Sequence, residues 1–79
     1  MMIRVKLIAN YREQLPSEAV NGVVELDVPD GTTVYDAISR FDIPLDETSV
    51  IVLNGLTVDL NTPLHDGDMV TAFSAIAGG

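Results

Sequence analysis

The residues best suited to chemistry in this chain are its last four, Ile76-Ala77-Gly78-Gly79, which directly follow a predicted strand. Glycine is costly inside a regular element and useful where a backbone has to be thin and free in shape. The pair Gly78-Gly79 therefore predicts a tail, residues 76–79, that enters a narrow site and presents the carboxyl group of Gly79. Extended, this tail reaches about 13 Å at roughly 3.3–3.6 Å per residue. A frayed end that is glycine-rich by chance is the alternative.

No side chain of the sequence suggests catalysis. The 79 residues include no cysteine, which excludes a thiol nucleophile and a thiolate metal site. We find no nucleophile–base set and no glycine-rich phosphate loop. His65 lies in a polar turn, where a solvated or hydrogen-bonded role is expected, and Asp66-Gly67-Asp68 is more typical of a turn than of a metal site. We therefore expect a protein that is not catalytic alone and binds no metal or cofactor.

The charge balance is strongly acidic, with twelve acidic and four basic residues and a net charge of −8. Nucleic-acid binding depends on cationic contacts to phosphate and is disfavoured. A partner with a basic surface is favoured, unless the acidity serves solubility alone. No apolar run reaches the roughly 18 residues of a membrane span, and Met1-Met2-Ile3-Arg4 does not begin a secretory signal. A cytoplasmic protein without a membrane partner is expected.

Two alternating segments near the start predict a pair of strands. Residues 3–10 and 23–28 alternate between apolar and polar side chains, which is typical of half-buried strands. Their pairing is predicted to be antiparallel, with a long connection that includes a helical turn around Arg12–Leu15.

One helix is predicted after the turn residues Pro29-Asp30-Gly31. Thr33 is a suitable N-cap, and Asp36 three residues later is a variant of the capping box. Pro44 disfavours helical backbone at Ile43 and ends the segment. This predicts a helix of two to three turns with one apolar face, made of Val34, Ala37, Ile38 and Phe41.

Three more strands are predicted in the second half, at residues 50–53, 56–58 and 69–76. Asn54-Gly55 favours a two-residue hairpin, because both central residues of a type I′ turn need positive φ. Leu64 is expected to fill the core under a polar connection. The element order predicts an α+β fold, a mixed sheet of about five strands with one main helix packed on one face. This domain would span residues 1–75.

The last strand offers the predicted docking surface. If Val70, Ala72 and Ser74 face the core, then Thr71, Phe73 and Ala75 point outward. Thr71, Phe73 and Ile76 would form an apolar patch beside the tail, where a partner has to bind. A register shifted by one would instead bury Phe73. Asp66 and Asp68 are expected to pair with a basic rim on the partner.

Several segments together resemble the ubiquitin-like sulfur carriers, which include the small subunit of molybdopterin synthase (MoaD) and the thiamine sulfur carrier (ThiS). The resemblance covers essentially the whole chain and implies a β-grasp fold, with the first and last strands side by side and parallel in the centre. The matching segments are Val5-Lys6-Leu7-Ile8-Ala9-Asn10-Tyr11-Arg12-Glu13, Val28-Pro29-Asp30-Gly31-Thr32-Thr33-Val34, Val52-Leu53-Asn54-Gly55, Thr62-Pro63-Leu64-His65-Asp66-Gly67-Asp68-Met69-Val70, Phe73 and Ile76-Ala77-Gly78-Gly79.

Family membership implies a chemistry for the tail. A carboxylate is a poor electrophile, so a ubiquitin-activating-like adenylyltransferase of the MoeB or ThiF type would use ATP to form an acyl-adenylate on Gly79. A sulfur donor would then displace AMP and leave a C-terminal thiocarboxylate. The carrier would serve as a cosubstrate, with a molybdopterin synthase large subunit or a thiazole synthase as its second partner.

The pathway stays open at this stage. The connection from Arg12 to Val23 has the length found in MoaD, whereas the ending Ile76-Ala77-Gly78-Gly79 looks more like ThiS. Molybdenum or tungsten cofactor synthesis is the leading interpretation, and thiamine thiazole synthesis is an alternative. A protein modifier joined to targets through Gly79 is another, and a plain β-grasp interaction module is a third.

Overall fold

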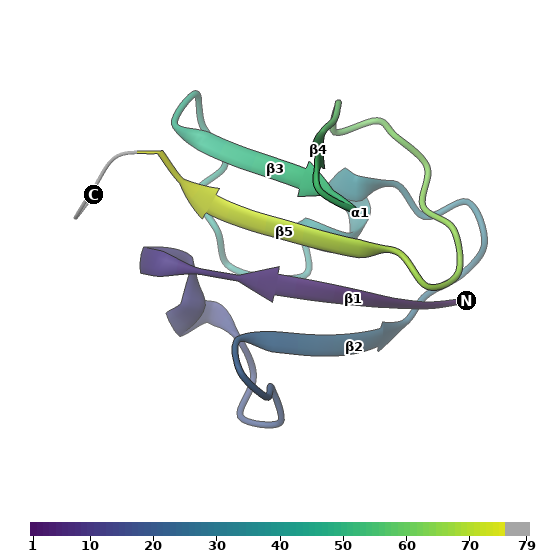
Figure 1. Ribbon diagram of the computed structural model, residues 1–79, viewed down its shortest axis with the longest axis horizontal. Helices are drawn as coiled ribbons and strands as arrows, with labels where there is room; N and C mark the ends of the chain where they lie inside the picture. Colours follow the sequence, from purple (N-terminus) through teal and green to yellow (C-terminus); the bar gives the residue numbers. More distant parts are fainter. Residues whose placement is uncertain (76–79) are drawn as a thin grey trace.

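A computed structural model describes residues 1–75 (Figure 1). In this range the chain forms one five-stranded sheet, ordered β2-β1-β5-β3-β4. The central strands β1 and β5 are parallel, and the other neighbours are antiparallel. The expected α+β, β-grasp architecture is thereby confirmed. Its elements are β1 (Met2–Leu7), η1 (Ala9–Gln14, a 3-10 helix), β2 (Val23–Asp27), α1 (Val34–Ile38), β3 (Ser49–Leu53), β4 (Leu56–Thr57) and β5 (Met69–Ser74).

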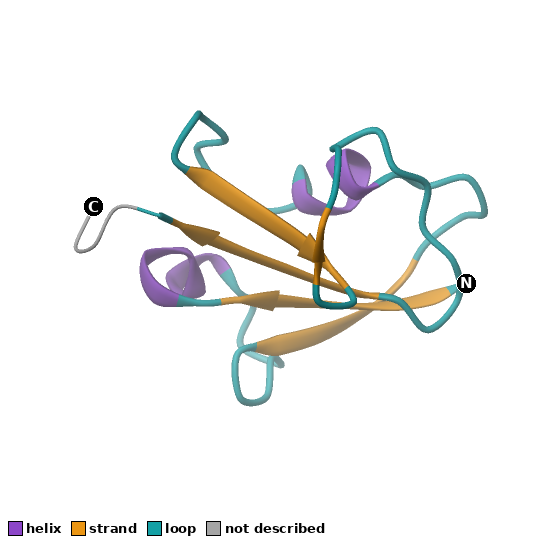
Figure 2. Ribbon diagram, turned by 45° about the horizontal axis from the view of Figure 1, so that its top comes forward, coloured by secondary structure: helices purple, strands orange, loops and turns teal. Residues whose placement is uncertain are grey.

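The fold has two layers, because α1 lies behind the sheet in Figure 1 and rises above it when the molecule is turned in Figure 2. The core fills the space between them, and Leu64 contributes to it as expected, at 4% exposure. Within residues 1–75, no helix covers the opposite face of the sheet (Figure 2). The buried apolar side chains are Ile3, Val5, Leu7, Tyr11, Val24, Val28, Val34, Ala37, Ile38, Ile51, Leu64, Val70 and Ala72.

The first strand ends three residues earlier than the alternation predicted. Ile8 still donates its N–H to the carbonyl oxygen of Ala72 at 3.2 Å, but Ala9 has a φ of 55°. An L-residue in this left-handed region breaks the extended backbone. The chain then enters η1, a helical segment that overlaps the helical turn predicted around Arg12–Leu15 and begins earlier, at Ala9.

The capping box of the helix is confirmed, and its length is corrected. The Thr33 side chain accepts from the Asp36 N–H at 3.2 Å, and the Asp36 carboxylate accepts from the Thr33 N–H at 3.1 Å. However, α1 ends at Ile38, because the N–H groups of Arg40 and Phe41 bond three residues back. This tighter pattern closes the helix into turns. Phe41 still packs against the core from outside the helix.

The Asn54-Gly55 hairpin is confirmed, with φ of 51° and 88° at its two central residues. β4 ends at Thr57 and β5 at Ser74, so both are shorter than predicted. For β5, the partner strand β3 begins at Ser49, which pairs with Ser74, and no further ladder is available to extend it.

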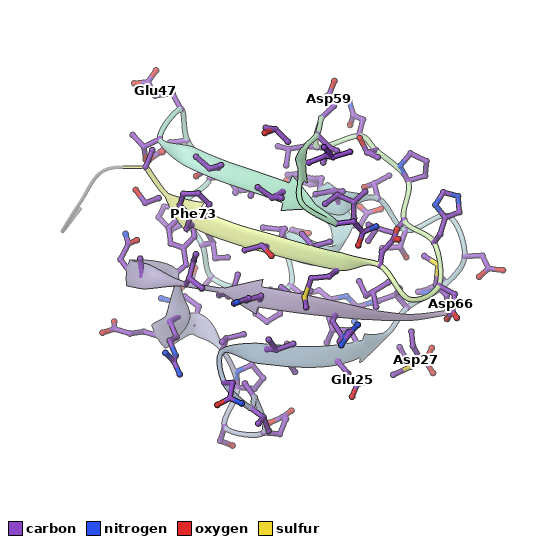
Figure 3. The ribbon with its side chains drawn as sticks, in the orientation of Figure 1. Glu25, Asp27, Glu47, Asp59, Asp66 and Phe73 are labelled. Carbon is purple, nitrogen blue, oxygen red and sulfur yellow. The ribbon has the colours of Figure 1, made fainter. Side chains whose placement is uncertain are left out.

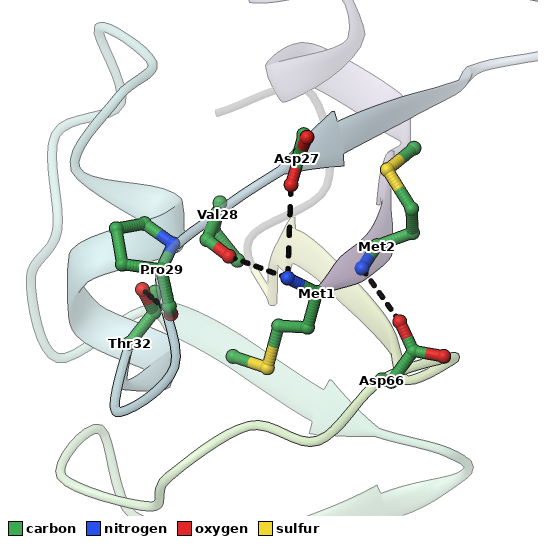
Figure 4. Close-up of polar contacts among 7 residues, drawn as sticks. All are labelled: Met1, Met2, Asp27, Val28, Pro29, Thr32 and Asp66. Carbon is green, nitrogen blue, oxygen red and sulfur yellow. Dashed lines mark hydrogen bonds and ion pairs between the residues drawn. The ribbon is translucent and has the colours of Figure 1, made fainter.

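The start of the chain lies at the end of the sheet opposite to the end where β5 finishes (Figure 1), and Figure 4 shows its polar contacts. The ammonium group of Met1 donates to the Val28 carbonyl oxygen at 2.8 Å and lies 3.6 Å from the Asp27 carboxylate. The Met2 N–H donates to the Asp66 carboxylate at 2.7 Å. These contacts connect β1, the end of β2 and the turn before β5. Among the described residues, no helix is long and apolar enough to cross a membrane.

Candidate functional site

The candidate site begins at Ala75, the residue directly after the end of β5. Its N–H donates to the carbonyl oxygen of Thr48 at 2.7 Å, and the hydroxyl groups of Thr48 and Ser74 lie 3.4 Å apart. The loop before β3 therefore holds the last described residue of the chain. The predicted tail residues Ile76, Ala77, Gly78 and Gly79 lie outside the described residues, so their chemical role stays a prediction.

Asp46 organises that loop. Its Oδ1 accepts the Thr48 N–H at 2.8 Å and the Thr48 hydroxyl at 2.6 Å. The hydroxyl bond, followed by the backbone bond, lowers the pKa of the Asp46 carboxyl group, since both stabilise its charged form.

A second contact joins the loop to the core. The Tyr11 hydroxyl, on a side chain that is 3% exposed, lies 2.7 Å from the Ser49 hydroxyl. The same Ser49 hydroxyl accepts the Asp46 N–H at 3.1 Å. The loop that holds Ala75 is thus connected to η1.

The predicted register of β5 is confirmed. Val70 and Ala72 have no exposed surface, whereas Thr71 and Phe73 are half-buried on the face opposite α1. The alternative register, which would bury Phe73 in the core, is wrong. Figure 3 shows Phe73 near the C-terminal end of β5. Its contact with a partner stays a prediction.

Sequence reasoning missed the other residues of this open face. Val50 pairs with Phe73, and Val52 pairs with Thr71. On the other side of β5, Lys6 pairs with Thr71 and Arg4 with Met69. The alternation of β1 and the apolar run of β3 were visible in the sequence, but their alignment against β5 was not. We name the set Val50, Val52, Met69, Thr71 and Phe73 the open-face patch.

The expected position of Asp66 and Asp68 close to the tail is wrong, whereas their pairing with a basic rim on a partner stays a prediction. Both residues precede β5, and Figure 3 shows Asp66 at the end of the strand opposite Phe73. Asp68 accepts the Asn54 side-chain amide at 2.9 Å and the His65 N–H at 2.8 Å. The two aspartates stabilise the turn, as the sequence Asp66-Gly67-Asp68 predicted. His65 is solvent-exposed, with its Nδ1 3.9 Å from the Asp68 carboxylate.

Other features of residues 1–75 give little chemistry. In this part of the chain, no group of three or more histidine, cysteine or acidic side chains could hold a metal ion. A cavity of about 480 Å³ lies along the outer edge of β3, beyond the end of β4. It is lined by Leu45, Asp46, Ser49, Val50, Ile51, Thr57, Val58, Asp59 and Leu60.

Solved structures share this fold. SAMP1, the small archaeal modifier protein 1, from Haloferax volcanii is 26% identical over 100% of both chains, with a TM-score of 0.76. A Pyrococcus furiosus protein described as molybdopterin converting factor, subunit 1, is 24% identical over 95% of this chain and 98% of its own, with a TM-score of 0.76. A Helicobacter pylori chain, from a complex of subunits 1 and 2 of molybdopterin-converting factor, is 22% identical over 100% of both chains, with a TM-score of 0.62.

No curated protein matches the sequence. The sequence profile of the ThiS family, however, matches residues 5–79, a range that includes both the open-face patch and the diglycine. With this match over nearly the whole chain, on a β-grasp fold, the protein belongs to the ThiS family.

Proposed function

We propose that this protein is a sulfur carrier whose Gly79 carboxyl group is converted to a thiocarboxylate. The observation that carries the proposal is the ThiS family match, which runs through Gly79. The arrangement at the end of β5 supports the proposal. Ala75 is hydrogen-bonded to Thr48, and Phe73 of the open-face patch lies two residues before Ala75. A tail that continues from a fixed base can be delivered into a partner's active site while the patch contacts the same partner.

The chemistry needs two steps. First, a Gly79 carboxylate oxygen attacks the α-phosphorus of ATP, pyrophosphate leaves, and an acyl-adenylate forms on the activating enzyme. Next, a sulfide equivalent adds to the acyl carbon, the carbon–oxygen bond to AMP breaks, and a thiocarboxylate remains. The thiocarboxylate sulfur then attacks an electrophilic carbon of the acceptor and displaces a leaving group, which forms a thioester. Hydrolysis of the acyl–sulfur bond leaves the sulfur on the acceptor and returns the Gly79 carboxylate. The chain itself supplies the carboxyl group and the docking surface.

As the route that uses the sulfur, we propose molybdopterin biosynthesis, with this chain as the small subunit. The Helicobacter pylori structure is a complex of subunits 1 and 2 of molybdopterin-converting factor, and its matching chain shares this fold. By analogy the partners are a large subunit and a ubiquitin-activating-like adenylyltransferase, and the location is the cytoplasm. Sulfur delivery for the thiamine thiazole is the alternative within the family.

Intact-protein mass spectrometry tests the proposal directly. The chain is incubated with ATP, the adenylating enzyme of the same organism and sulfide. Replacement of one oxygen by sulfur, localised to the peptide that ends in Ala77-Gly78-Gly79, is the expected result. Removal of Gly79, or Gly78→Leu, should abolish the mass shift and leave the urea midpoint unchanged. No shift with an enzyme that modifies its own carrier would overturn the proposal.

A second candidate is a protein modifier joined to target lysines through Gly79. It is favoured by the similarity to small archaeal modifier protein 1, which extends over 100% of both chains. Both candidates share the adenylation step and differ in the product. Tryptic peptides of other proteins in which a lysine is joined to residues 41–79 of this chain would favour the modifier, since Arg40 is the last basic residue of the sequence. A thiocarboxylate alone would favour the carrier.

A further inference from the structure

The charge of the open face differs in sign from the charge of the whole protein. The chain carries a net charge of −8 and only four basic residues. Two of these, Arg4 and Lys6, lie on the central strand β1 and are aligned with Met69 and Thr71 of the open-face patch. The acidic residues labelled in Figure 3, Glu25, Asp27, Glu47, Asp59 and Asp66, lie around the margins of the sheet. The middle of the face is therefore apolar and cationic within an acidic surround.

The two cations have different neighbours. Arg4 is aligned with Glu25 of β2, so an acidic residue lies directly across from it. Lys6 is aligned with Val23 on one side and Thr71 on the other, and both are uncharged. Val52 lies beyond Thr71 in the same row. Lys6 is thus a half-buried cation in an apolar row, without a carboxylate in the aligned positions of its neighbours.

Covering this row with a partner has an electrostatic consequence. A partner that contacts Thr71 and Phe73 removes water from Lys6 as well, because Lys6 is next to Thr71 in the sheet. A charge that is taken out of water without a counter-charge is strongly unfavourable. A partner that fits this face therefore has to supply an anion opposite the Lys6 ammonium group.

We infer that the partner surface docking on the open-face patch is apolar with a carboxylate that pairs with Lys6. This inference rests on the proposed function, since the partner concerned is the adenylating enzyme that acts on Gly79. The acidic composition of the chain favours a partner with a basic surface. The inference instead requires an acidic group on the part of the partner surface that meets Lys6. The acidic margin can still meet basic groups at the rim, where charges contribute more to association rate than to affinity.

Charge-reversal variants separate local pairing from the effect of net charge. Lys6→Glu and Arg40→Glu each change the net charge from −8 to −10, and Arg40 is exposed just after α1, away from the open face. Binding to the adenylating enzyme is measured by surface plasmon resonance at low and high salt. Lys6→Glu should weaken binding about 30-fold or more, as for the loss of a buried charge pair. Arg40→Glu should bind within about threefold of wild type.

Lys6→Met and Lys6→Arg complete the set. The methionine variant keeps an apolar stem but should weaken binding, because the partner's carboxylate loses its counter-charge. The arginine variant keeps the positive charge and should bind like wild type. Circular dichroism melts of all four variants establish that they are folded. Equal binding by Lys6→Glu and Arg40→Glu, or tighter binding by Lys6→Glu, would overturn the inference.

The same experiment distinguishes the two proposals. If wild type acquires the thiocarboxylate while Lys6→Glu binds as well as Arg40→Glu, the sulfur-carrier function stands and the role of Lys6 is refuted. If the wild-type protein is neither bound nor adenylated by an enzyme that is active on its own carrier, the sulfur-carrier function is refuted, and the inference about Lys6 is refuted with it.

Discussion

The backbone N–H of Ala75 donates to the carbonyl oxygen of Thr48 at 2.7 Å, which joins the end of the central strand β5 to the loop before β3. Thr48 is itself held by two hydrogen bonds to Asp46. The position from which the tail leaves the domain is therefore determined by a loop residue 27 positions earlier in the chain. A carrier that inserts its end into another protein benefits from such a base, because less freedom is lost on docking.

Asp46→Ala is expected to loosen this base. The substitution removes the acceptor of the Thr48 N–H and hydroxyl groups, so hydrogen exchange at the Ala75 amide should become faster while the protection of β1 stays unchanged. Hydrogen exchange followed by NMR measures both. Asp42→Ala, an exposed acid in the same connection, is the matched control and should leave Ala75 as in wild type. Identical exchange in the two variants would refute the role of Asp46.

The lowered pKa of Asp46 predicts a pH dependence with a definite sign. A carboxyl group whose pKa is lower in the folded state stabilises the protein above the unfolded value, about 3.9, and this contribution is lost as the pH falls through the folded value. Protection of the Ala75 amide should therefore be constant from pH 7 to about 5 and decline below pH 4. In Asp46→Ala the decline should be absent, as measured by exchange rates corrected for intrinsic pH effects.

Ile38→Ala tests the packing of α1 on the sheet. Ile38 has no exposed surface, and alanine favours helix, so the loss should come from packing alone. The expected cost is about 2–5 kcal/mol of unfolding free energy, measured by urea denaturation. The control Val20→Ala, at a side chain that is 68% exposed, should change stability by less than about 0.5 kcal/mol. A cost below 1 kcal/mol at Ile38 would mean that the helix is not packed as described.

Gly55→Ala tests the hairpin between β3 and β4. Gly55 has a φ of 88°, and an added Cβ would meet no atom within 4 Å, so the cost should be backbone strain alone. Strain of this kind is worth about 1–2 kcal/mol. Gly55→Asn should cost less, because asparagine tolerates the left-handed region better. If urea denaturation gives equal stability for alanine and wild type, the type I′ turn is not the conformation in solution.

Phe73→Ala tests the open-face patch separately from folding. Phe73 is half-buried on the face opposite α1, so the unfolding free energy should fall by about 1 kcal/mol or less. Affinity for the adenylating enzyme should fall at least about tenfold, as is usual for an aromatic residue at the centre of an interface. Leu56→Ala is the control, since Leu56 is 71% exposed but lies on β4 outside the patch. Equal affinity for both variants would exclude Phe73 from the interface.

The sequence alone determined the local elements of this protein. Alternation identified β1 and β2, Thr33 and Asp36 identified the capping box, and Asn54-Gly55 identified the hairpin. These predictions succeeded because period and turn chemistry are properties of neighbouring residues. The facing of Thr71 and Phe73 away from the core followed from the same alternation.

Only the tertiary structure decided how these elements align. The parallel pairing of β1 with β5 places Lys6 beside Thr71, and β3 places Val50 and Val52 on the same face. The same pairing puts Asp66 at the end of β5 remote from Phe73. Such registers depend on contacts between residues distant in sequence, selected by the joint packing of both strands on one core. No local pattern contains that information, so the composition suggested a basic partner, whereas the alignment of the strands placed a cation at the centre of the open face.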